Sequence, residues 1–109
     1  MDRLRPHFII IYTTFPHRSQ ARKLAWNLIK EKLIACANIF KIDSIYEWEN
    51  KIEEPREYGV FLKTRAELYT KVEKRIKELH PYEVPCIISW KIENGSKDFL
   101  DWIADRTAT

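Results

Sequence analysis

Soft-metal binding is the chemistry for which this sequence carries the most suitable side chains, namely two cysteines and three histidines. Thiolate and imidazole groups are ligands that copper accepts well in proteins. Cys36 lies between two alanines after a helix-like segment, where a free cysteine commonly serves as a small buried hydrophobic residue. His80, Glu83 and Cys86 are spaced three residues apart, but in a proline-rich loop this spacing does not make their side chains point in one direction. Metal binding by these three residues therefore competes with a simpler role for His80, binding the last free carbonyl groups of a helix.

Other catalytic and binding chemistries lack their characteristic motifs. The two cysteines lie fifty positions apart without a Cys-x-x-Cys pattern, which excludes a zinc ribbon and a disulfide scaffold. No Gly-rich loop is present to hold a nucleotide or an oxyanion, and adjacent acids such as Glu53 and Glu54 are typical of a solvated turn. Lysine and arginine alternate with glutamate along the predicted helices, without an RNA-binding signature. We therefore expect neither an enzyme nor a nucleic-acid-binding protein.

Size and composition indicate one domain that spans residues 1–109. With 45% apolar and 32% charged residues, a chain of 109 residues forms one core but not two. The net charge, 19 − 16 = +3, is too small to indicate a nucleic-acid or membrane partner. The apolar run near the N-terminus, about five residues, is too short for a signal peptide or a membrane span. We expect a cytoplasmic protein with reduced thiols.

The periodicity of the apolar residues predicts an α+β domain. Along the chain, the pattern predicts a strand at 7–14, a helix at 17–33, a hairpin at 35–49 and 52–63, a helix at 65–79, a strand at 86–92 and a helix at 98–105. The first strand is β-branched or aromatic almost throughout, which is typical of a central strand buried on both faces. Right-handed crossovers turn this order into a ferredoxin-like βαββαβ sandwich with a long hairpin, both inner helices on one face, and a C-terminal helix.

Three local signals refine these elements. Thr64 and Glu67 match a capping box, in which the two side chains satisfy the first free amides of a helix. Trp26 and Ile29 widen the apolar stripe of the first helix. Asn50 predicts the hairpin turn, because asparagine tolerates the left-handed conformation of such turns.

The predicted hairpin is longer than the helices on which it would pack. Its fifteen residues from 35 to 49 would span about 50 Å, whereas the first helix of about 17 residues would span about 25 Å. The overhanging part carries apolar side chains, and a two-stranded ribbon is marginal alone. We therefore predict an oligomer interface made by Ile45, Tyr46, Trp48, Ile52 and Tyr58. The alternative is a bulge or break near residues 41–43 that folds the hairpin back onto its own sheet.

Six segments spread over nearly the whole chain are similar to one protein family. They are 12–16 (YTTFP), 33–38 (LIACAN), 44–54 (SIYEWENKIEE), 63–65 (KTR), 80–85 (HPYEVP) and 99–103 (FLDWI). In this combination the chain resembles the CutA family of divalent-cation tolerance proteins. The resemblance implies a ferredoxin-like fold assembled as a homotrimer through its long hairpins, in an arrangement similar to the PII signalling proteins.

The same resemblance implies candidate site residues. Cys36 and His80 match the family as metal contacts, with copper as the metal and no obligatory cofactor. A complete site would need further ligands, from Glu83, Cys86 or a neighbouring subunit, and Cys86 stands where the family often has an acidic residue. Trp48 and Tyr82 are candidate walls of an inter-subunit cleft, with ordinary interface packing as the alternative.

Two functions follow as hypotheses. The first is a non-enzymatic cytoplasmic homotrimer that takes part in tolerance of divalent metals, chiefly copper. The alternative is a PII-like sensor or scaffold, whose inter-subunit clefts bind a small molecule or a protein partner and whose metal affinity is incidental. Neither hypothesis involves nucleic acid or a membrane.

Overall fold

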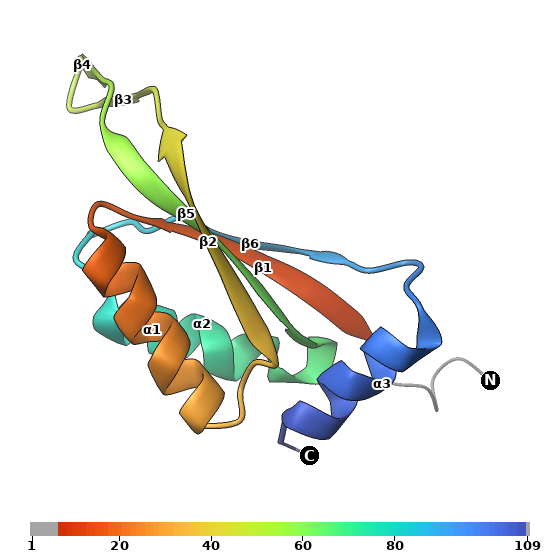
Figure 1. Cartoon of the computed structure of the whole chain (residues 1–109). Coiled ribbons are helices and arrows are strands. Elements are labelled where there is room, and N and C mark those ends of the chain that lie inside the picture. Colours follow the sequence, from red (N-terminus) through yellow and green to blue (C-terminus); the bar gives the residue numbers. More distant parts are fainter. Residues whose placement is uncertain (1–6, 109) are drawn as a thin grey trace.

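Two helices cover one face of a four-stranded antiparallel sheet in the computed structural model, which describes residues 7–108 (Figure 1). The elements are β1 (Phe8–Phe15), α1 (Arg18–Lys30), β2 (Cys36–Asp43), β3 (Tyr46–Trp48), β4 (Lys51–Glu53), β5 (Arg56–Arg65), α2 (Tyr69–Leu79), β6 (Ile87–Lys91) and α3 (Lys97–Arg106). The sheet order is β2-β5-β1-β6, and β3 pairs with β4 in a separate small sheet. The predicted α+β, ferredoxin-like fold is confirmed. Residues 1–6 and 109 of the predicted domain lie outside the described residues, and within 7–108 no helix has the length and apolar character needed to cross a membrane.

The core lies between the sheet and the helices α1 and α2. Ile11 and Phe15 of β1 are fully buried there, together with Leu24 of α1 and Ile76 of α2. Alternate residues of β1 point to the other face of the sheet. Ile10 and Tyr12 on that face are only half-buried, and the prediction that β1 is buried on both faces is therefore wrong for a single chain.

Helix α1 buries a narrower stripe than its sequence suggested. Its buried residues are Ala21, Leu24, Ala25 and Leu28. Trp26 and Ile29, which were predicted to widen the stripe, are 63% and 44% exposed. These four residues follow the i, i+3, i+4, i+7 spacing, so the sheet and α2 cover a single narrow stripe of the helix. The bulky flanking side chains remain outside.

The hairpin is interrupted on both strands. β2 ends at Asp43 and β5 begins at Arg56, and the predicted continuous strands over 35–49 and 52–63 are therefore wrong. The break lies at Ser44 and Ile45, just beyond the 41–43 position considered from the sequence. Pro55 is the matching interruption of the return strand, because proline has no N–H to donate to a ladder. The N–H of Ser44 donates to the Pro55 carbonyl at 3.0 Å, which keeps the two strands together through the bend.

The hairpin tip nevertheless projects beyond the helices (Figure 1), and the longest dimension of the molecule is 49 Å. Glu49 and Asn50 form the turn with φ of 51° and 67°. The left-handed conformation predicted for Asn50 is thus confirmed, and Glu49 shares it. The tip is a two-stranded ribbon of three residues per strand.

The second helix does not begin with the predicted capping box. The Thr64 hydroxyl is fully buried and donates to the Leu33 carbonyl at 2.6 Å. A 3-10 turn, Ala66–Leu68, then leads into α2 without a side-chain cap. Thr64 belongs to β5 with its side chain toward the core, and a buried carbonyl there is a closer partner than the helix amides.

The uncovered face of the sheet carries a cluster of aromatic rings over Gly59. The Phe61 ring lies 5.0 Å from Phe40, 5.7 Å from Tyr12 and 6.0 Å from Trp90, between ring centres. A Cβ at Gly59 would lie 2.8 Å from the Phe40 ring. Only a glycine leaves room for this ring to cross β5.

Gly59→Ala should therefore lower the free energy of unfolding by about 1–3 kcal/mol, because the added methyl overpacks a ring held by its neighbours. Urea unfolding at fixed protein concentration measures this. In a double-mutant cycle, Phe40→Leu should relieve part of the penalty. Gly95→Ala is the matched control, since its Cβ would meet only the end of the flexible Leu100 side chain, at 3.0 Å. Equal stability of the Gly59→Ala variant and wild type would contradict the steric assignment.

Candidate functional site

Cys36 and His80, the two predicted metal contacts, lie at opposite ends of the sheet. Cys36 is the first residue of the edge strand β2 and pairs with Lys63, which in turn pairs with Ile10 of β1. His80 contacts Thr14, four residues further along β1. Four strand residues span about 13 Å, and two strand spacings separate the pair sideways as well. One chain therefore does not bring these two side chains together.

Both ring nitrogens of His80 are occupied by the backbone. Nε2 lies 2.5 Å from the Thr14 carbonyl oxygen, and the N–H of Tyr82 donates to Nδ1 at 3.1 Å. Because Nδ1 accepts, Nε2 carries the proton and donates. The ring also stacks on Phe15, with 4.3 Å between centres. His80 thus fastens the loop after α2 to β1, and its burial lowers the pKa of the imidazole, against the weaker opposing effect of the Thr14 hydrogen bond.

The remaining predicted ligands do not complete a metal site with His80. Glu83 and Cys86 both line a cleft beside the loop, but His80 does not line it. Across residues 7–108, no group of three His, Cys, Asp or Glu side chains is placed to hold a metal ion. In the folded loop, the side chains of His80, Glu83 and Cys86 therefore do not converge on one point, despite their three-residue spacing.

The Cys36 thiol has the surroundings of a half-buried hydrophobic residue. Burial raises the pKa of this thiol, and the nearby Lys63 only partly opposes the effect. The Lys63 ammonium group donates to Asn38 Oδ1 at 2.9 Å, so its charge is already engaged. Nothing in these contacts activates the thiol as a nucleophile, since activation requires a lowered pKa. Cys36 lies on the uncovered face of the sheet, where a second chain could reach it.

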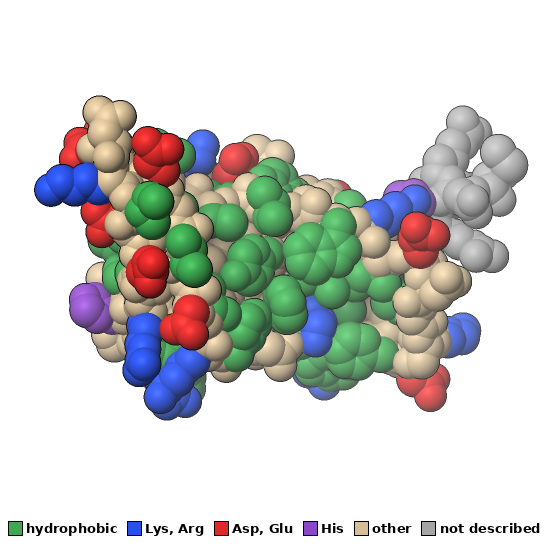
Figure 2. All heavy atoms as spheres, turned by 90° about the horizontal axis from the view of Figure 1, so that it is seen from above, with side chains coloured by type: hydrophobic (Ala, Val, Ile, Leu, Met, Phe, Trp, Pro, Cys, Tyr) green, Lys and Arg blue, Asp and Glu red, His purple; other side chains and the backbone are tan. Residues whose placement is uncertain are grey.

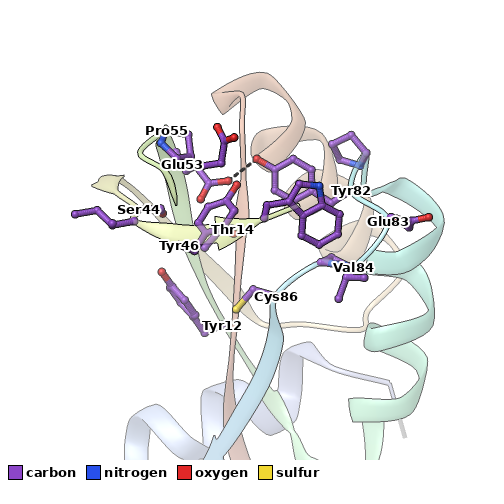
Figure 3. A pocket seen from close by; sticks show the side chains of 15 residues that line it. Tyr12, Thr14, Ser44, Tyr46, Glu53, Pro55, Tyr82, Glu83, Val84 and Cys86 are labelled. Atoms are coloured by element: carbon purple, nitrogen blue, oxygen red, sulfur yellow. Dashed lines mark hydrogen bonds between the residues drawn. The ribbon is translucent and has the colours of Figure 1, made fainter. Parts of the chain in front are cut away.

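A cleft lies between the bent hairpin tip and the loop after α2 (Figure 3). Its volume is about 930 Å³. Trp48 and Tyr82, predicted to share a cleft, both line it within one chain, together with Tyr12 of β1 and Tyr46 of β3. Cys86 lies at its base, near Tyr12 (Figure 3). The break in the hairpin creates this cleft, because it turns β3 toward the loop.

A buried carboxylate, Glu57, is the charged group of the cleft that sequence reasoning missed. It is only 3% exposed, and the Tyr82 hydroxyl donates to its Oε2 at 2.5 Å. Burial and this hydrogen bond raise the pKa of Tyr82. Every second side chain of a strand points to the same face of the sheet. Glu57 therefore lies on the uncovered face of β5, together with Gly59 and Phe61. Only the fold revealed that a tyrosine from a distant loop covers it there.

A large apolar surface covers the open face of the sheet (Figure 2). Ile88 and Trp90 of β6 are 54% and 44% exposed, and Phe99 and Trp102 of α3 are also exposed. The alternation of apolar and polar residues along 86–92 indicates that one side of this strand is apolar and belongs to such a surface. One strand does not reveal that the other three strands of the sheet add rings of their own, those of Tyr12, Phe40 and Phe61.

The predicted interface residues divide into two groups. Ile45, Tyr46, Trp48 and Ile52 are all exposed at the hairpin tip. Tyr58, in contrast, packs against the core of its own chain. The hairpin tip is therefore available to a partner, while Tyr58 already has an intramolecular contact.

The chain is similar to proteins and solved structures of one family. A family model described as CutA1 divalent ion tolerance protein matches residues 9–106. A protein of Pyrococcus horikoshii called divalent-cation tolerance protein CutA is 48% identical over 91% of this chain and 97% of its own length. A crystal structure of a CutA1 variant from the same organism has a TM-score of 0.90 at 48% identity, covering 93% of this chain and 99% of that one. The Archaeoglobus fulgidus protein described as periplasmic divalent cation tolerance protein CutA has a TM-score of 0.89 at 42% identity, covering 91% and 97%.

The His80 contacts predict a pH dependence of stability. The folded state lowers the pKa of His80. The contribution of His80 to the free energy of unfolding is therefore complete above the pKa of the unfolded state, near 6.5, and is lost as pH falls through the lower pKa of the folded state. The free energy of unfolding, measured between pH 7.5 and 5, should therefore fall more steeply for wild type than for His80→Asn. His17→Asn, at an exposed position, should follow the wild-type slope. Parallel curves for wild type and His80→Asn would show that the imidazole is not held neutral.

Proposed function

The chain belongs to the CutA1 family of divalent ion tolerance proteins, and from that premise we propose that it acts in divalent-metal tolerance as a non-enzymatic homotrimer. The single observation that carries the self-assembly is the aromatic surface on the open face of the sheet. The number three comes from the family resemblance. The surface itself requires only that copies of the chain meet.

The argument for self-assembly is one of uncovered apolar area. Fully burying a large apolar side chain contributes about 1.5–3 kcal/mol, and several such side chains lie together here. Large contiguous apolar patches on soluble proteins commonly mark contact sites. The exposed tip residues Ile45 and Ile52 extend the available surface along the hairpin. A partner that covers both regions would bury what one chain leaves in water.

Replacing Trp90 with glutamate should dissociate the assembly, because a charge in the middle of the apolar face opposes its burial. Light scattering at micromolar concentration should give a multiple of 13.1 kDa for wild type and a shift toward 13.1 kDa for Trp90→Glu. Trp26→Glu is the matched control, since Trp26 is 63% exposed on the helical side. A wild-type particle of 13.1 kDa, or a Trp90→Glu variant that assembles as wild type does, would contradict the proposal.

Copper is the metal we propose, with Cys36 as its first contact. A soft thiolate suits copper, and Cys36 lies half-exposed on the face proposed for assembly. Residues 7–108 of one chain hold no group of three such ligands, so a complete site would draw on more than one copy. His80 remains a candidate in the family pattern, but it would bind only after releasing its hydrogen bonds to Thr14 and Tyr82.

Copper(II) titration by calorimetry tests this part of the proposal, with zinc as the control metal. Cys36→Ser should weaken binding by about tenfold or more, whereas Cys86→Ser should leave it unchanged. Loss in Cys36→Ser alone would assign binding to that thiol, and an added loss in His80→Ala would indicate a site shared between chains. Weak binding that is the same in all variants would contradict a specific copper site.

A second candidate function is ligand sensing at the cleft, as in the PII-like alternative. The observation that favours it is the volume of about 930 Å³ between Trp48 and Tyr82, which is the size of a small-molecule site. On this proposal a metabolite or a protein segment binds beside the hairpin tip, and metal affinity is incidental.

A cytoplasmic location is also part of the proposal. Its support is that Cys36 and Cys86 are both free, which suits a reducing compartment. Because the Archaeoglobus fulgidus relative is called periplasmic, fractionation of the source cells is the direct test.

A further inference from the structure

The cleft beside the hairpin tip combines aromatic walls with negative charge. The rings of Tyr12, Tyr46, Trp48 and Tyr82 line it, Glu53, Glu57 and Glu83 supply carboxylates, and none of the described lining residues is basic. Figure 3 shows that Tyr12, Tyr46 and Tyr82 come from three separate segments and surround one opening. Aromatic faces and carboxylates both attract positive charge. The cleft is thus electrostatically complementary to a cation.

Glu57 sets the charge at the centre of this cleft. Its carboxylate is 3% exposed and fixed by the Tyr82 hydroxyl at 2.5 Å. Its negative charge contributes to raised pKa values of two neighbouring groups, Cys86 and Tyr12. Burial, and then the Glu57 charge, raise the pKa of the Cys86 thiol, and the same charge adds to the raised pKa of Tyr12. Burial itself opposes charge of either sign, but the Glu57 charge disfavours a second negative charge in the cleft and favours a positive one.

The lining suits an organic cation better than a metal ion. A metal ion needs several oxygen, nitrogen or sulfur ligands converging on one point, and no such group of three occurs among residues 7–108. Ring faces instead bind cations that give up their hydration easily, such as alkylated ammonium groups. The aromatic walls would contact the alkyl part of such a ligand, while Glu57 balances its charge.

We propose that this cleft binds a small organic cation of the substituted ammonium type, with its positive charge between the Tyr46, Trp48 and Tyr82 rings and the Glu57 carboxylate. The proposal rests on the ligand-sensing alternative above and names the chemistry of its ligand. It does not depend on copper binding.

Tetramethylammonium chloride is the probe, compared with sodium chloride and with neopentyl alcohol, which has a similar shape without charge. Chemical-shift changes of the Trp48 indole N–H, assigned with Trp48→Phe, report binding. Saturable shifts with tetramethylammonium, at least about tenfold stronger than with the neutral molecule and absent with sodium, are the expected result.

Three variants locate the site. Glu57→Gln retains an oxygen for the Tyr82 hydroxyl and removes the charge, and it should weaken tetramethylammonium binding by about tenfold. Tyr46→Leu removes one ring from an exposed position of the tip, so it tests the proposal independently of any effect of Glu57→Gln on folding. Glu93→Gln, an exposed carboxylate outside the cleft, should bind as wild type does.

Light scattering of the same samples separates this inference from the assembly proposal. An assembled protein whose Trp48 signal does not respond to tetramethylammonium would overturn the cation site while leaving self-assembly intact, and would indicate that a second copy fills the cleft. Equal binding of the neutral molecule, or unchanged affinity in both Glu57→Gln and Tyr46→Leu, would also overturn it. Binding by a monomeric protein would support the cation site and contradict the assembly.

Discussion

Helices α1 and α2 cover one face of the sheet, whereas α3 reaches only the end of the other face, where Ile103 packs on Phe8. The rest of the molecule is arranged around that constraint. Both α1 and α2 follow right-handed crossovers, so both pack on the same side. The other side still carries Phe40, Phe61 and Trp90, packed so closely that Gly59 must lack a side chain. Rings of this size contribute fully only when they are removed from water. One chain leaves these rings partly exposed, and this exposure is the basis of the self-assembly that we propose.

A break in the hairpin and the side-chain contacts of the loop after α2 build the cleft at the end of this face. Pro55 interrupts the return strand of the hairpin, and the tip consequently bends and carries Tyr46 and Trp48 sideways. His80 fastens the loop after α2 to β1 through Nε2, while its Nδ1 accepts from the N–H of Tyr82 within the loop. The hydrogen bond from Tyr82 to Glu57 then ties that loop to β5. The cleft thus has walls from elements far apart in the sequence, each fixed by its own polar contact.

The proposed metal binding and the proposed assembly involve the same face of the sheet. Cys36 lies at the start of β2 on the uncovered side, next to Lys63, so a neighbouring copy that covers this face would also surround the thiol. A single chain offers no convergent set of ligands within residues 7–108. The direct metal binding that we propose would therefore need the assembled protein, whereas the cleft is already formed by one chain.

The motifs of the sequence carried the resemblance to the family, and the sequence by itself determined the element order, the fold class, the left-handed turn at Asn50, and the exposed apolar tip at Ile45 and Ile52. These depend on local periodicity and on residue types, which neighbouring positions report. Tertiary structure decided the rest: where the hairpin bends, that Thr64 bonds to a core carbonyl rather than a helix amide, that Cys36 and His80 lie apart, and that Tyr82 covers Glu57. Each of these outcomes depends on which partner is closest in space. Sequence separation does not show which partner is closest in space, because the fold brings together residues that are far apart in the sequence.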